Sequence, residues 1–144
     1  MNDCIEAANA CACFNVRRTA RLVTQVYDDA LAGVGVSSGQ FVVLLSTRIL
    51  GESTMQELAE AVSLDRSALS RALQPLIRRN LVQMTVGKDR RTRRIALTVE
   101  GLQLLKDGAP FWMAAQERMQ AALGQDGFSE LLSTSRRSFE QLAK

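Results

Sequence analysis

The sequence predicts a mainly α-helical chain with one small β-hairpin. Apolar residues recur at helical spacing near the N-terminus and again over the last third of the chain. Between these stretches, helix-capping signals open short helices, and one segment then changes to the alternating pattern of strands. The chain has 144 residues, 47% of them hydrophobic and 23% charged, which is enough apolar material for one domain with a packed core.

Two helices are expected in the first 50 residues. The first runs over about residues 5–31 and ends where Gly33 interrupts the pattern. Ser37 followed by Gln40 forms a capping box, which predicts a second helix over about residues 38–50.

A pair of short helices joined by a tight turn follows. Thr54 and Glu57 form a second capping box, and Asp65 is placed to cap the next helix, which Asn80 ends in the left-handed conformation. This layout predicts a helix-turn-helix. Its second helix turns one polar face outward, made of Arg66, Ser67, Ser70, Arg71 and Gln74.

A β-hairpin is expected next. Residues 81–86 and 94–97 have the pattern of strands, and residues 87–89 have the composition of a turn. Because an isolated hairpin is marginal in water, this one must pack on the preceding helices as a wing.

A long helix completes the chain. Thr98 caps it, Gly108 and Pro110 predict a kink, and residues 124–127 predict a break before a last amphipathic segment. The two end segments are more apolar than a small winged module needs, which indicates that they pack against another copy of the chain.

Basic residues are concentrated in one segment. Residues 65–94 carry nine basic residues against two acidic ones, a net charge of +7, whereas the rest of the chain carries nine against thirteen, a net charge of −4. This distribution is typical of a nucleic-acid-binding face, and a solvated helical surface is the alternative. The chain has no histidine, which excludes Ser-His-Asp catalysis and histidine metal ligation.

Four short motifs between residues 64 and 98 resemble the MarR family of bacterial transcription regulators. They are LDRSALSR at 64–71, NLV at 80–82, DRR at 89–91 and IALT at 95–98. The resemblance implies a winged helix-turn-helix fold with long N- and C-terminal dimerisation helices, in one domain over 1–144. The dimerisation helices would cover 5–35 and 99–144, and the DNA-binding lobe would cover 37–98. Asn80 stands where the family usually has glycine and tolerates the same backbone conformation.

The resemblance also implies a set of DNA contacts. Ser67, Ala68, Ser70 and Arg71 would face base edges in the major groove, with Arg66 and Gln74 on the same face. Arg91 would enter the minor groove, Asp89 would orient the wing arginines or simply form the turn, and Lys88, Arg90 and Arg93 would hold phosphates. Thr54 is either a phosphate contact through its backbone N–H or a plain helix cap. Arg78 and Arg79 are expected to be solvated.

Three cysteines lie near the N-terminus, Cys4, Cys11 and Cys13, and form no even disulfide framework. The stretch from Cys13 to Tyr27 is similar to the first helix of the organic-hydroperoxide-sensing branch of the family. This similarity implies that Cys13 is the reactive cysteine and Tyr27 one retained tyrosine partner, whereas Arg17 replaces the other tyrosine. Arg17, one turn after Cys13, favours the thiolate.

Two alternatives to a redox role stay open for the cysteines: buried core residues, or a soft-metal site made of thiolates. On a continuous helix, Cys11 and Cys13 would point about 200° apart and could not easily pair.

A small, often aromatic and anionic ligand is the other signal that the resemblance implies. Phe14, Phe41, Phe111 and Trp112 are the candidates to line its pocket, although aromatic residues at helical spacing are more often core. We expect double-stranded DNA and a second copy of the chain as partners, an oxidant or small molecule as effector, no cofactor, no metal and no enzymatic activity.

The cysteine content and the lack of an apolar run near 20 residues favour the cytoplasm and no membrane insertion. The expected function is a DNA-binding transcription regulator, a repressor released by its effector. Two alternatives belong to other classes: a thiol-based peroxidase that uses Cys13, and a winged-helix module for protein contacts.

Overall fold

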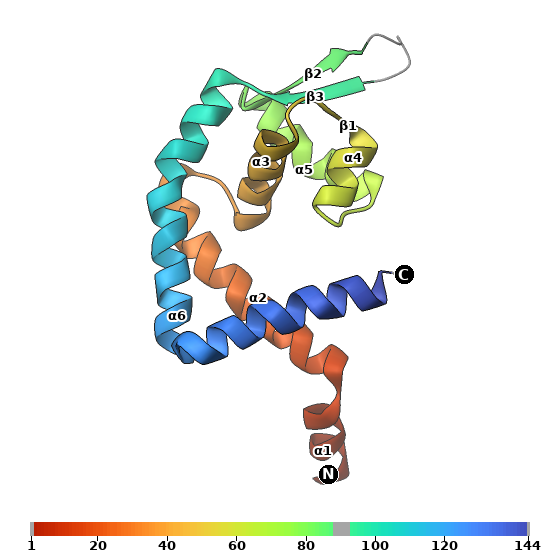
Figure 1. Ribbon diagram of the computed structural model, residues 1–144, viewed down its shortest axis with the longest axis vertical. Helices are drawn as coiled ribbons and strands as arrows, with labels where there is room; N and C mark the ends of the chain where they lie inside the picture. Colours follow the sequence, from red (N-terminus) through yellow and green to blue (C-terminus); the bar gives the residue numbers. More distant parts are fainter. Residues whose placement is uncertain (1, 88–92, 144) are drawn as a thin grey trace. The chain divides into compact units, whose positions relative to one another are not determined.

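The computed structural model describes residues 2–87 and 93–143 and confirms a mainly helical fold with a small sheet (Figure 1). The elements in chain order are α1 (Asn2–Ala10), α2 (Ala12–Leu31), η1 (Ala32–Val34), α3 (Ser38–Leu50), β1 (Ser53–Thr54), α4 (Met55–Ala61), α5 (Arg66–Arg78), β2 (Val82–Val86), β3 (Arg93–Leu97) and α6 (Val99–Leu142).

The chain divides into two compact units. One consists of Met1–Ala30 and Trp112–Lys144, which we call the terminal unit, and the other is Leu31–Phe111, which we call the winged unit. Helix α6 contributes to both. The assignment of 5–35 and 99–144 to dimerisation helices within a single domain stays a prediction.

The sheet of the winged unit has three antiparallel strands in the order β1-β3-β2. The predicted hairpin is confirmed, with Val82 opposite Leu97 and Val86 opposite Arg93. Strand β1 was not predicted, because it has only two residues and no alternating pattern. It pairs with β3 through Ser53–Ile95 and Thr54–Arg94, so it fastens the wing to the helix-turn-helix.

Helices α3, α4 and α5 bury leucines against this sheet. Leu44, Leu58, Leu69, Leu76 and Ile95 have no exposed surface. These residues come from α3, α4, α5 and β3, so the predicted apolar stripes of the three helices meet in one core.

The predicted helix starts are confirmed as hydrogen-bonded caps. The Ser37 hydroxyl accepts from the Gln40 N–H, and Gln40 accepts in return from the Ser37 N–H. Asp65 accepts from the Ala68 N–H at 2.7 Å, which opens α5. Asn80 follows α5 with a φ of 54°, as expected of a left-handed helix end.

The N-terminal helix is interrupted at Cys11, so the prediction of one helix over about 5–31 was wrong. The side-chain amide of Asn15 donates to the carbonyl oxygens of Asn9 at 2.9 Å and Cys11 at 3.0 Å. The Asn9 carbonyl thereby gains a donor near the end of α1, whereas the Cys11 carbonyl also accepts the Asn15 backbone N–H at 3.1 Å.

Helix α6 is interrupted at Gly124, where φ is 71° and ψ is 164°, as predicted for the 124–127 segment. The kink expected at Gly108 and Pro110 introduces no such break, because Gly124 is the one residue of α6 with non-helical backbone angles. Gly108 instead allows close packing, since an added Cβ would lie 2.6 Å from Phe41 Cε2.

No single helix among the described residues is long and apolar enough to cross a membrane. One pair, Ala12–Val34 with Ser38–Leu50, meets the length and composition criteria only when taken together, and it is bent by 75°.

Replacing Gly101 with alanine should destabilise the fold. A Cβ at this position would lie 2.0 Å from the Leu81 carbonyl oxygen, a backbone atom that cannot rotate away. We expect Gly101→Ala to lower the free energy of unfolding in urea by about 1–3 kcal/mol or more. Gly39→Ala is the control, because its Cβ would be 3.9 Å from Ser37 Oγ and should stabilise α3 by up to about 1 kcal/mol. Equal stabilities of the two variants would contradict the close approach.

Candidate nucleic-acid interface

Helix α5 presents the predicted polar face to solvent. Its apolar side, with Leu69, Leu73 and Leu76, is buried in the winged unit. The opposite side exposes all five residues expected there, Arg66, Ser67, Ser70, Arg71 and Gln74, whereas Ala68 is half-buried. The helix therefore has the orientation that a recognition helix requires.

Arg71 is held by a neighbour on the same face. Its Nη1 donates to Ser67 Oγ at 2.8 Å, one turn earlier in the helix. The hydrogen bond restricts the guanidinium before any ligand binds, which lowers the entropy cost of a directed contact.

Thr54 forms the junction between β1 and α4. Its hydroxyl accepts from the Glu57 N–H at 3.2 Å, and its own N–H donates to Glu57 Oε2 at 2.7 Å. The Thr54 N–H is therefore used within the chain, so the geometry favours the helix cap over the phosphate contact. The Thr54 backbone and hydroxyl hydrogen bonds, with the nearby Arg94 charge, hold the pKa of the Glu57 carboxyl below its usual range.

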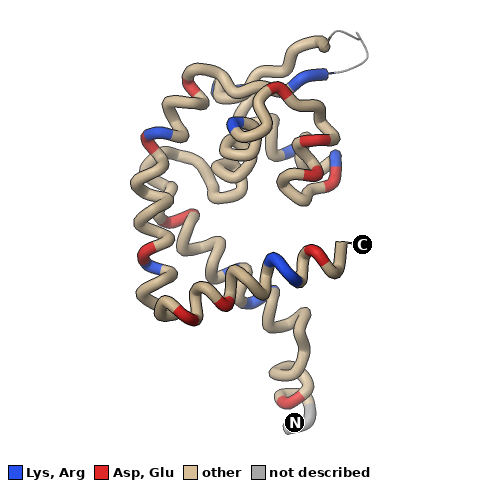
Figure 2. Tube along the Cα trace, viewed as in Figure 1, with Lys and Arg blue, Asp and Glu red and all other residues tan. Residues whose placement is uncertain are grey.

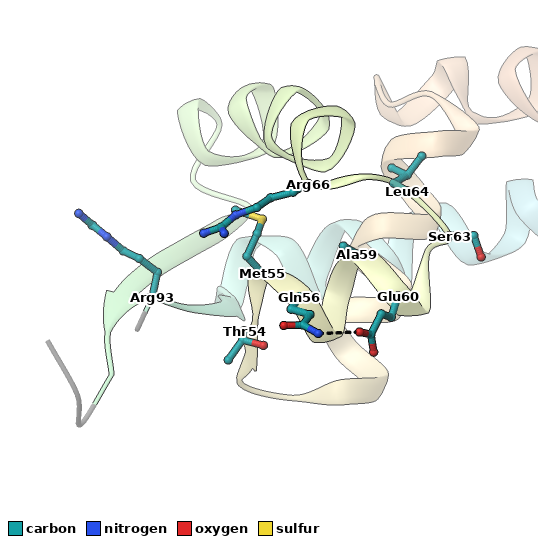
Figure 3. A pocket seen from close by; sticks show the side chains of 9 residues that line it. All are labelled: Thr54, Met55, Gln56, Ala59, Glu60, Ser63, Leu64, Arg66 and Arg93. Carbon is teal, nitrogen blue, oxygen red and sulfur yellow. Dashed lines mark hydrogen bonds between the residues drawn. The ribbon is translucent and has the colours of Figure 1, made fainter. Parts of the chain in front are cut away.

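A depression of about 670 Å³ lies beside this junction (Figure 3). Arg66 from the start of α5 and Arg93 from the start of β3 line it, with Met55, Ala59 and Leu64 as apolar lining. Glu60 also lines it and accepts a hydrogen bond from Gln56 at 3.0 Å. The depression thus brings together one basic residue of the helix-turn-helix and one of the wing strand.

Basic residues mark the beginning of β3, at the end of the described wing (Figure 2). Four of the predicted DNA contacts, Lys88, Asp89, Arg90 and Arg91, lie outside the described residues.

Arg78 and Arg79 are both exposed, as expected, but Arg79 also makes a hydrogen bond within the chain. Its Nη1 donates to the Gly35 carbonyl oxygen at 2.6 Å and ties the end of α5 to the turn before α3.

All three cysteines are free and exposed in the single chain, so the alternative of buried core cysteines is wrong for the monomer. Cys11 lies between α1 and α2, and Cys13 lies in the first turn of α2. The estimate that the two side chains point about 200° apart assumed a continuous helix and does not apply across this break.

The neighbours proposed for Cys13 have other contacts in the structure. The Tyr27 hydroxyl donates to Gln116 Oε1, its ring centroid is 6.3 Å from that of Trp112, and burial raises the pKa of the hydroxyl. Arg17 lines a depression on α2 with Phe14, and the Arg18 guanidinium lies 5.2 Å from the centre of the Phe14 ring.

The four aromatic residues proposed for a ligand pocket belong to different units. Phe14 and Trp112 are in the terminal unit, and Phe41 and Phe111 are in the winged unit. Phe41 is buried and packs against Gly108. It therefore has the core role that was the alternative to lining a ligand pocket. Over residues 2–87 and 93–143, no group of three or more acidic or cysteine side chains could hold a metal ion.

Comparison with known proteins decides the family. A sequence model of the MarR family matches residues 36–92. The M. tuberculosis transcriptional regulator MosR, solved in complex with DNA, is 33% identical, and the alignment covers 92% of this chain and 98% of MosR with a TM-score of 0.78. The chain belongs to the MarR family. The MarR family consists of DNA-binding transcription regulators.

Two further known proteins are similar to this chain, one in fold and one in sequence. A mutant MarR of E. coli bound to operator DNA has the same fold, with 21% identity, coverage of 85% of this chain and 89% of that protein, and a TM-score of 0.79. YwoH of Bacillus subtilis (strain 168), an uncharacterized HTH-type transcriptional regulator, is 27% identical over 85 residues, or 59% of this chain. The match spans 62% of the length of YwoH.

Proposed function

We propose that this MarR-family protein is a cytoplasmic repressor that binds pseudo-palindromic promoter DNA as a homodimer. The exposed polar face of α5, with Arg71 held by Ser67, carries the proposal. In this proposal Ser67, Ala68, Ser70 and Arg71 read bases, with Arg66 and Gln74 beside them. Arg91 enters the minor groove, Asp89 orients the wing, and Lys88, Arg90 and Arg93 hold phosphates.

Arg71→Ala should reduce sequence discrimination. An operator is first selected from random duplexes by gel shift, and the affinity of each variant is then measured on operator and random DNA over a range of salt concentrations. Losing a bidentate base contact should cost about 1–3 kcal/mol on the operator alone. Lys88→Ala should weaken both DNAs alike and flatten the salt dependence. Arg78→Ala is the control on the same helix, and an equal loss on both DNAs for Arg71→Ala would contradict base reading.

The terminal unit supports the homodimer, because its helices expose apolar side chains. Val16, Leu22 and Phe139 are 65%, 69% and 55% exposed. A groove of about 630 Å³ runs between α2 and the C-terminal part of α6, with Leu22, Val26, Met119, Leu123 and Leu131 among its lining residues. Uncovered apolar surface of this extent is typical of an interface, and in our proposal a second copy covers it.

Leu22→Glu should therefore produce monomers. Placing a carboxylate in an apolar interface costs its desolvation, so sedimentation at micromolar concentration should show a dimer for the wild type and a monomer for this variant. Ile49→Glu is the matched control, since Ile49 is 74% exposed on α3 of the winged unit. A monomeric wild type would contradict the homodimer.

For the signal, we propose that Cys13 responds to organic hydroperoxides, with Arg17 one turn further along α2, Tyr27 nearby in the dimer and Cys11 beside it. The thiolate sulfur attacks the terminal peroxide oxygen and the O–O bond breaks. This gives a sulfenic acid and an alkoxide, which takes a proton from water to become an alcohol. The exposure of Cys13 gives the oxidant access. The alternative signal is a small aromatic anion bound near Phe14, Phe41, Phe111 and Trp112.

Stoichiometric hydroperoxide should release the wild type from its operator but leave Cys13→Ser bound. Cys4→Ser is the matched control and should respond like the wild type, and mass spectrometry should detect the sulfenic acid. If the wild type keeps its affinity, or Cys13→Ser loses it equally, the effector is a small ligand. Steady peroxide turnover with a thiol reductant would instead indicate the peroxidase, and salt-insensitive partner binding would indicate a protein-contact module.

A further inference from the structure

One carboxylate connects the helix-turn-helix to the wing strand. Glu57 Oε2 accepts hydrogen bonds from the Thr54 N–H at 2.7 Å and the Thr54 hydroxyl at 2.9 Å. The same oxygen lies 3.7 Å from Arg94 Nη1, on β3. Glu57 therefore contacts both the junction of β1 with α4 and the strand that leads into the wing tip.

The backbone link at this place is short. Strand β1 pairs with β3 over only two residue pairs, Ser53–Ile95 and Thr54–Arg94. Thr54–Arg94 is the pair nearer the wing tip, so the contact of Glu57 with Arg94 extends this link by a side chain. The next residue along β3 is Arg93, which lines the same depression as Arg66.

We propose that Glu57 is a positioning residue that fixes the base of the wing relative to the helix-turn-helix through Arg94. The inference rests on the proposed DNA-binding function and adds a requirement to it. Arg66 and the wing arginines must contact one DNA duplex at the same time, so the strand that carries Arg93 needs a fixed place beside α4 and α5. A wing free to move would lose orientational entropy on binding.

A glutamine at position 57 separates this role from helix capping. The capping box accepts either glutamate or glutamine at this position, and Gln40 fills it in the α3 cap of the same chain, where Oε1 accepts from the Ser37 N–H at 3.0 Å. Glu57→Gln thus keeps an acceptor for Thr54 and removes the charge that attracts Arg94.

Glu60→Gln is the matched control. Glu60 lies one turn further along α4, is exposed, and accepts from Gln56. Both substitutions remove one negative charge from the same helix, and loss of a negative charge near polyanionic DNA should by itself tighten binding. A positioning role predicts the opposite sign for Glu57→Gln alone.

The experiment measures operator and random-duplex affinities of the full chain, with hydrogen exchange of the β1 and β3 amides as a readout without DNA. We expect Glu57→Gln to bind the operator about twofold to fivefold more weakly than Glu60→Gln, the range of an exposed ion pair, and to exchange these amides faster. Arg94→Gln should cost less in the Glu57→Gln background than in the wild type.

Operator affinity of Glu57→Gln equal to or tighter than that of Glu60→Gln would overturn the positioning role and leave Glu57 as a helix cap. If the wild type binds its operator normally in that experiment, the proposed function stands without this inference. If the wild type binds no duplex DNA, the proposed function itself is wrong and the inference falls with it.

Discussion

The winged unit depends on the capping box at the start of α4. Thr54 is both the last residue of β1 and the N-cap of α4, so one residue ends the strand that holds the wing and begins the helix that precedes α5. The reciprocal hydrogen bonds between Thr54 and Glu57 satisfy backbone and side-chain groups at the point where the chain leaves the sheet. Helix α4 begins at this point, and the turn that follows it leads to α5, which exposes Arg71.

Local signals predicted most of the winged unit. Capping by Ser37, Thr54 and Asp65 involves residues three apart, so the sequence contains the whole interaction. Strand β1 could not be predicted in this way, because its partners Arg94 and Ile95 lie about forty residues further along the chain and two residues carry no periodicity. The ion pair of Glu57 with Arg94 was missed for the same reason.

The terminal unit was predicted less well. The break in its first helix and the exposure of its cysteines depend on individual side-chain contacts, which hydrophobic periodicity does not describe. The apolar spacing before residue 31 continues across Cys11, so it does not predict the break, where the Asn15 side-chain amide donates to the carbonyls of Asn9 and Cys11. Cys13 is exposed because few residues from other parts of the single chain cover α2. The residues within one turn of Cys13 do not indicate this lack of cover. Four wing residues of the candidate site, 88–91, are not tested by the structure.

The two units differ in how completely one chain buries its apolar surface. The winged unit has a leucine core with no exposed surface, so it needs no partner to hold α5 in place. In the terminal unit, Leu22 and Phe139 remain largely exposed, so the stability of that unit in our proposal comes from a second copy. A chemical change at Cys13, at the start of α2, would then act in the unit where the single chain leaves large apolar side chains exposed. In our proposal, a modification in the terminal unit therefore acts on the dimer while the buried core that holds α5 stays intact.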